Sequence, residues 1–165
     1  MKLPFLYSVP LACVLLVLPV SLSASYSQSP DAITESKVLA IINSVDRAAR
    51  KGNVSAILAP LAKDVKIKMT LLTPTGEQVL NFTKEQYAFH TRRGFRRRLA
   101  YQLERKNTRV KINEDGKTAT VTGDLNETLT VQQGTLRAVS SETGIFNLRD
   151  GKIVVTSLES RTRFY

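Results

Sequence analysis

The most regular stretch of the chain is residues 117–131, where apolar and polar positions alternate without a break. A repeat of two residues is typical of a β-strand that is buried on one face. The positions that form the mainly aliphatic row are Ala119, Val121, Gly123, Leu125, Glu127, Leu129 and Val131. The other row is rich in threonine and can face water. The pattern therefore predicts a half-buried antiparallel strand whose aliphatic face is covered by another layer, with Glu127 as the charged exception.

The N-terminal half of the chain predicts helices that can supply this layer. In residues 36–51, apolar positions recur at steps of three and four, as on one face of an amphipathic helix, and Gly52 marks its end. Residues 54–62 predict a second helix, which Pro60 shortens.

A third helix is predicted to begin at Lys84. The side chain of Thr83 can cap its first turn, and Gln86, three residues later, completes a capping box. Gly94 is expected to end or loosen this helix.

Short alternating runs and the turns between them predict five further strands. These strands cover residues 65–73, 79–82, 99–112, 136–148 and 152–164. Tyr101 and Val110 are in opposite phases, so a bulge is expected between Arg105 and Thr108. Two-residue turns are predicted at the dipeptides Asp115-Gly116, Gln133-Gly134 and Asp150-Gly151. The element order, two helices, a hairpin, a helix and a long meander, predicts an α+β fold.

Three short segments carry a resemblance to a known fold family. They are Lys-Gly-Asn at residues 51–53, Leu-Ala-Lys-Asp-Val at 61–65, and Glu-Asp-Gly-Lys-Thr-Ala-Thr-Val at 114–121. In this order and spacing, the chain resembles the nuclear transport factor 2-like superfamily, which includes SnoaL-like polyketide cyclases and ketosteroid isomerases. The resemblance implies a cone-shaped, curved antiparallel sheet packed against N-terminal helices, and a homodimer. It does not set the function, because the superfamily contains enzymes, binding modules and assembly domains.

The resemblance also places two positions of the ketosteroid isomerase site on this sequence. The general base of that enzyme falls on Met69, and its phenol falls near Val45. Neither side chain can transfer a proton, so that isomerase mechanism is not expected here.

The first residues have the pattern of an export signal. Lys2 is followed by an apolar run at residues 11–20, and small residues suited to cleavage come next. Because a membrane span needs about 20 apolar residues, we expect residues 1–24 to be removed, with a retained anchor as the alternative. Residues 25–34 are then a polar lead-in and 35–165 a single domain. This organisation predicts a periplasmic or secreted protein.

The composition of the mature chain excludes several kinds of chemistry. Its cysteine content is zero after cleavage, because the single cysteine is Cys13, so neither disulfides nor thiolate chemistry are expected. The single histidine, His90, excludes a site with several histidine ligands, and no metal or cofactor is expected. Removal of Lys2 with the signal lowers the formal net charge from +10 to +9, which still favours anionic lipid, glycan or acidic protein partners, and export argues against nucleic acid.

Pairing through the predicted turns gathers polar residues on one face of the sheet. It places Glu142 opposite Glu159, Ser140 opposite Arg161, and Glu127 opposite Ser140. The predicted pocket residues are Glu127, Ser140, Glu142, Ser157, Glu159 and Arg161. These groups can line a ligand pocket at the open end of the cone, or Arg161 can bridge the glutamates at a solvated sheet end. Opposed carboxylates can raise one pKa, so Glu142, Glu159 and His90 are the catalytic candidates.

A second polar cluster begins in the last part of the third helix and continues past its end. Its arginines, Arg92, Arg93, Arg96, Arg97 and Arg98, can bind phosphate or sulfate groups, or can be a solvated surface. The sequence thus predicts a domain that binds a small ligand in its cone or a protein partner on its sheet, without catalysis. The alternatives are a SnoaL-like isomerase, cyclase or hydratase that uses a pocket carboxylate or His90, and a binder of anionic surfaces through residues 92–98.

Overall fold

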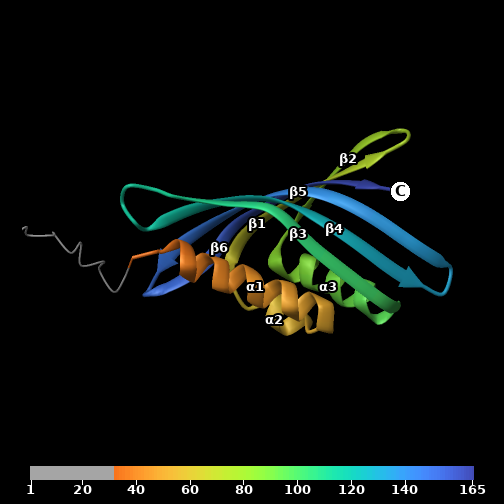
Figure 1. Cartoon of the computed structure of the whole chain (residues 1–165), viewed down its shortest axis with the longest axis horizontal. Helices are drawn as coiled ribbons and strands as arrows, with labels where there is room; N and C mark the ends of the chain where they lie inside the picture. The colour runs from red at the N-terminus through yellow and green to blue at the C-terminus, as the bar shows by residue number, and fades with distance from the viewer. Residues whose placement is uncertain (1–31) are drawn as a thin grey trace, which may run out of the picture.

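The computed structural model describes residues 32–165. The predicted signal at residues 1–24 and residues 25–31 of the predicted lead-in lie outside the described residues. Within the described part, no helix is long and apolar enough to cross a membrane. Three helices lie on one face of a curved sheet of six strands (Figure 1), so the predicted α+β architecture is confirmed.

The helices begin and end close to the predicted positions. Helix α1 (Glu35–Lys51) is capped by the Thr34 side chain and ends at Gly52, whose positive φ of 71° suits a glycine. Helix α2 (Val54–Leu58) is shorter than predicted, because the chain is already extended from Leu61 onward. Helix α3 (Lys84–Arg96) has the predicted capping box and continues past Gly94 to its end.

The strands form one sheet in the order β2-β1-β6-β5-β4-β3. Their bounds are β1 (Leu61–Thr73), β2 (Gly76–Phe82), β3 (Arg98–Ile112), β4 (Thr118–Val131), β5 (Gly134–Arg149) and β6 (Lys152–Phe164). The sheet is mixed rather than purely antiparallel, because β1 and β6 run parallel while every other pair is antiparallel. The meander starts at the far edge, at β3, and returns strand by strand until β6 lies beside β1.

The core fills the end of the sheet near the Asp150-Gly151 turn. There, Val38 and Ile42 of α1 belong to the same buried cluster as Ala119, Phe146 and Val155 of the sheet. The amide of Ile33 donates a 2.8 Å hydrogen bond to the carbonyl of Gly116 and fastens the start of α1 to this end.

One β-bulge decides which residues of β6 face inward. Leu148 pairs with Ile153 and Phe146 with Val155, as predicted, but Thr156 is an extra residue and the next pair is Ile145 with Ser157. The side chain of Thr156 accepts a 2.6 Å hydrogen bond from the Asn147 amide at this point.

Beyond the bulge the predicted β5–β6 register is wrong by one residue. Glu142 pairs with Ser160 instead of Glu159, and Ser140 pairs with Thr162 instead of Arg161. Because a shift of one residue exchanges the two faces of a strand, Glu159 and Arg161 leave the concave face.

The other two hairpins of the meander keep the predicted faces. The β4–β5 loop is Gln132-Gln133 rather than Gln133-Gly134, which shifts the register by two, so Glu127 pairs with Ala138. A shift of two preserves the face. The predicted bulge in β3 is confirmed between Lys106 and Arg109.

Candidate functional site

A cavity of about 610 Å³ lies between the helices and the concave face of the sheet. Its walls come from all three helices and from the inner faces of the six strands, and they are mostly apolar; Ile41, Val45, Phe95, Leu125 and Leu129 are examples. A largely apolar cavity with a few convergent polar groups is the usual form of a small-molecule site.

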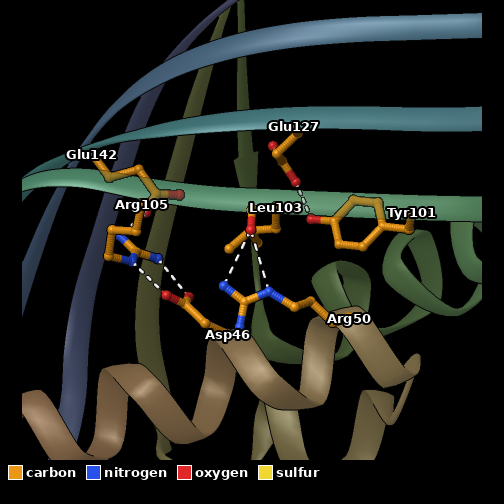
Figure 2. Close-up of polar contacts among 7 residues, drawn as sticks. All are labelled: Asp46, Arg50, Tyr101, Leu103, Arg105, Glu127 and Glu142. Carbon is orange, nitrogen blue, oxygen red and sulfur yellow. Dashed lines mark hydrogen bonds and ion pairs between the residues drawn. The ribbon is translucent and has the colours of Figure 1, made fainter.

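An ion cluster crosses the cavity from α1 to the sheet (Figure 2). The guanidinium of Arg105 donates two hydrogen bonds to the carboxylate of Asp46, at 2.9 and 3.0 Å, and one to Glu142 at 2.9 Å. Burial alone would lower the pKa of Arg105, but the hydrogen bond and charge of Asp46, together with Glu142, outweigh it and raise that pKa. Arg105 therefore keeps its positive charge, and both buried carboxylates depend on this charge for their stabilisation.

A second polar pair lies farther along β3 and β4. The hydroxyl of Tyr101 donates a short hydrogen bond to Oε1 of Glu127 (Figure 2). Burial raises the pKa of Glu127; the hydrogen bond from Tyr101 opposes the increase and the negative charge of Glu142 adds to it. Burial and the charge of Glu127 also raise the pKa of Tyr101, so the phenol keeps its proton and remains a donor.

Several polar atoms in the cavity retain unused hydrogen-bonding capacity. Among the described residues, Oε2 of Glu127 and Oε1 of Glu142 accept no hydrogen bond, and the buried hydroxyl of Ser160 has no partner. Tyr87 lines the same cavity, and burial followed by the charge of Glu142 raises its pKa to about 12. The cavity therefore offers free carboxylate acceptors to a ligand.

Three of the six predicted pocket residues line the cavity, namely Glu127, Ser140 and Glu142. The hydroxyl of Ser140 is already engaged with that of Thr162 at 2.8 Å. The other three predicted residues lie elsewhere because of the Thr156 bulge. Ser157 and Glu159 lie in a shallow basic groove on the outer face, and Arg161 pairs with Glu77 at the exposed edge.

The predicted arginine cluster is divided between two environments. Arg98 faces α1, where it donates a 2.8 Å hydrogen bond to the carbonyl of Ala49 and lies 4.5 Å from the ring centroid of Phe95. It therefore helps to hold the end of α1 against the sheet. The other four arginines are exposed.

Sequence reasoning missed Asp46 and did not assign Tyr101 and Arg105 to the pocket. Asp46 carried a signal, because it interrupts the apolar face of the first helix between Ile42 and Ala49. Tyr101 and Arg105 share one phase of β3, but the ion pair joins positions 59 residues apart, which a local pattern does not reveal.

The likeness of this chain to known proteins lies in its fold and not in its sequence. No protein-family model matches the sequence, and no curated protein sequence matches it either. Solved structures do match. An NTF2-like protein of unknown function from Pseudomonas putida superimposes with a TM-score of 0.64 at 18% identity, over 77% of this chain and 84% of that chain. This chain has the nuclear transport factor 2-like fold.

Two further structures show the range of proteins with the NTF2-like fold. An NTF2-like protein from Cytophaga hutchinsonii has a TM-score of 0.60 at 18% identity, over 78% of this chain and 98% of that one. A protein provisionally named scytalone dehydratase from Novosphingobium aromaticivorans has a TM-score of 0.61 at 10% identity, over 76% and 80% of the two chains. At these identities the likeness establishes the fold alone.

The cavity contains the two positions on which the general base and the phenol of ketosteroid isomerase were predicted to fall. Met69 and Val45 both line it, with apolar side chains. His90 lies at its rim, exposed, with its ring 5.1 Å from that of Phe82 and 5.5 Å from that of Phe89. His90 makes no hydrogen bond within the described residues, so nothing there orients it as a base. Within residues 32–165, no group of acidic or imidazole side chains is arranged to hold a metal.

The raised pKa of Glu127 predicts a pH-dependent stability. The folded protein binds the Glu127 proton more tightly than the unfolded chain, so this stabilisation is complete below the unfolded pKa of about 4.3 and is lost as pH rises through the folded pKa. Glu127→Gln removes this titration and keeps an oxygen that can accept from Tyr101. The variant should therefore gain stability relative to the natural protein as pH rises from about 4.5 to 7.5.

Urea unfolding across this pH range measures the difference. Glu159→Gln, the same change at an exposed position on the outer face, is the matched control and should follow the natural protein. Parallel curves for Glu127→Gln and the natural protein would contradict the assigned environment of Glu127.

Proposed function

We propose that this NTF2-like domain binds a small, mostly apolar organic molecule whose amine or hydroxyl group points at Glu127 and Glu142. The observation that carries the proposal is the apolar cavity of about 610 Å³ with free carboxylate oxygens inside it. Burial of apolar ligand surface supplies most of the affinity, at roughly 25 cal/mol per Å². The polar groups then select the head group.

The charges in the cavity favour a hydrogen-bond donor or a cation. The lining carries the three carboxyl groups of Asp46, Glu127 and Glu142, and one permanent cation, Arg105. Asp46 takes two of the guanidinium hydrogen bonds and Glu142 one, which leaves Glu127 with only a phenol. An anionic head group would be repelled, because like charges 4 Å apart cost about 4 kcal/mol in a partly buried setting.

Head-group selectivity tests the proposal with three ligands of one chain length, namely decylamine, decanol and decanoate. Titration calorimetry, at concentrations where each compound is dissolved as monomers, should show that the amine and the alcohol bind more tightly than the carboxylate. The ratio of the affinity for the amine to the affinity for the carboxylate should be at least about ten. Glu127→Gln should reduce this ratio by about tenfold, whereas the outer-face change Glu159→Gln should leave it unchanged. Tightest binding of decanoate, or no binding of any member, would overturn the proposal.

Proton-transfer catalysis is the second candidate function. A carboxyl of raised pKa beside a phenol, as in Glu127 and Tyr101, is an arrangement that can move a proton on a bound substrate. An isomerase, cyclase or hydratase would return a changed compound, whereas a carrier or sensor would return its ligand unaltered. The apolar run at residues 11–20 supports either activity taking place in the periplasm or outside the cell.

A further inference from the structure

The outer face of α3 combines positive charge with exposed apolar side chains. Positions 89, 92, 93 and 96 lie at spacings of three, four and seven residues, so they share one helix face. Arg97, which directly follows the helix, and Leu99, at the start of β3, are also exposed. We name these six residues the α3 patch: Phe89, Arg92, Arg93, Arg96, Arg97 and Leu99. The opposite face of the same helix supplies Tyr87, Thr91 and Phe95 to the cavity wall.

The arginines of the α3 patch are available for an external partner. All four are exposed, and among residues 32–165 none of them forms an ion pair. They lie within six consecutive positions around the end of α3. Such a density of unpaired guanidinium groups attracts phosphate groups.

The two apolar members of the α3 patch expose most of their surface to water, which is unfavourable in free energy. Phe89 is 59% exposed and Leu99 is 67% exposed. Leu99 is turned outward by a bulge, since Arg98 pairs with Val131 and Ala100 with Thr130, which leaves Leu99 as the extra residue. An aromatic and an aliphatic side chain beside arginines is the composition of surfaces that insert into the boundary between lipid head groups and acyl chains.

We infer that the α3 patch docks on a bilayer that contains anionic phospholipids. The guanidinium groups bind the phosphates, and the side chains of Phe89 and Leu99 enter the region below the head groups. A soluble polyanion would match the arginines but would leave both apolar side chains in water. The inference concerns the outer face of α3 and is independent of whether the cavity holds a ligand.

Vesicle flotation of the full chain tests the inference. The natural protein should float with phosphatidylcholine vesicles that contain about one third phosphatidylglycerol, and far less with phosphatidylcholine alone. The quadruple change R92Q, R93Q, R96Q and R97Q should lower the partition coefficient by about 100-fold or more, because each arginine near an anionic surface contributes about fivefold. The double change F89S and L99S should lower it by about tenfold.

Two controls isolate the α3 patch. The changes R47Q, R109Q, R137Q and R163Q remove the same charge from four exposed arginines elsewhere, and they should leave binding within about threefold of the natural value. All variants have the same N-terminus, so any binding by the residues before the domain is common to them. Retention on immobilised heparin should fall when the four patch arginines are replaced, and it should stay unchanged in the F89S and L99S variant.

Three outcomes would overturn the inference. Equal losses for the two quadruple variants would mean that net charge acts without a docking face. Full binding by the F89S and L99S variant would mean that the patch recognises polyanions rather than a bilayer. Equal flotation with neutral and anionic vesicles would remove the role of the arginines.

Discussion

Replacing Arg105 with methionine should destabilise the folded protein by about 3–5 kcal/mol. Among residues 32–165, Arg105 is the only cation that contacts Asp46 and Glu142, whose side chains are 7% and 21% exposed. Its removal leaves two carboxylates close together, with little solvent to stabilise their charge. Because a domain of this size is stable by about 5–15 kcal/mol, the loss would take a large fraction of the total.

Urea unfolding near neutral pH, with Arg109→Met as the control, measures this effect. Arg109 lies on the same strand but is exposed and has no ion pair among the described residues, so its replacement should cost less than about 0.5 kcal/mol. Adding Asp46→Leu to Arg105→Met should recover part of the loss, because the more deeply buried carboxylate is then gone. Equal effects of Arg105→Met and Arg109→Met would contradict the buried ion cluster.

Replacing Ala138 with phenylalanine should lower the affinity for decylamine by about 100-fold. Ala138 lies on the inner face of β5, opposite Glu127, and its side chain lines the cavity. A phenyl ring there occupies the space that the alkyl chain of the ligand needs and covers the carboxylate that binds its head group. Since the ring enters an existing cavity rather than a filled core, the cost in stability should be below about 1 kcal/mol.

Val139→Phe is the matched control for this variant. Val139 is the next residue, it is 42% exposed, and it lies on the opposite face of the sheet. Titration calorimetry should give this variant the natural affinity for decylamine. Unchanged binding by Ala138→Phe would place the ligand somewhere other than the cavity.

Most of the fold could be predicted from the sequence because its signals are local. The alternation in β4, the capping box at Thr83 and the Asp150-Gly151 turn each depend on a few neighbouring residues. The parallel pairing of β1 with β6 has no such local signal, because it follows from the path of the whole meander.

The candidate site could be predicted less completely, because one extra residue, Thr156, exchanges the two faces of β6 beyond it. The turn at Asp150-Gly151 sets the register of β5 and β6 correctly only as far as Thr156, where the bulge moves Glu159 out and Ser160 in. A signal was present, since the apolar positions of this strand change phase from Val155 to Leu158. The pairing of Asp46 with Arg105 depends on how α1 lies across β3, which no pattern within either segment specifies.

Native mass spectrometry of the protein purified from the cells that make it tests the central claim most directly. The complex is dissociated by denaturation, and the released compound is identified beside the same preparation of Ala138→Phe. We expect the natural protein to release a mostly apolar compound with an amine or hydroxyl group, and Ala138→Phe to release none. A natural protein that carries nothing, or the same compound recovered from both proteins, would contradict a ligand site in the cavity.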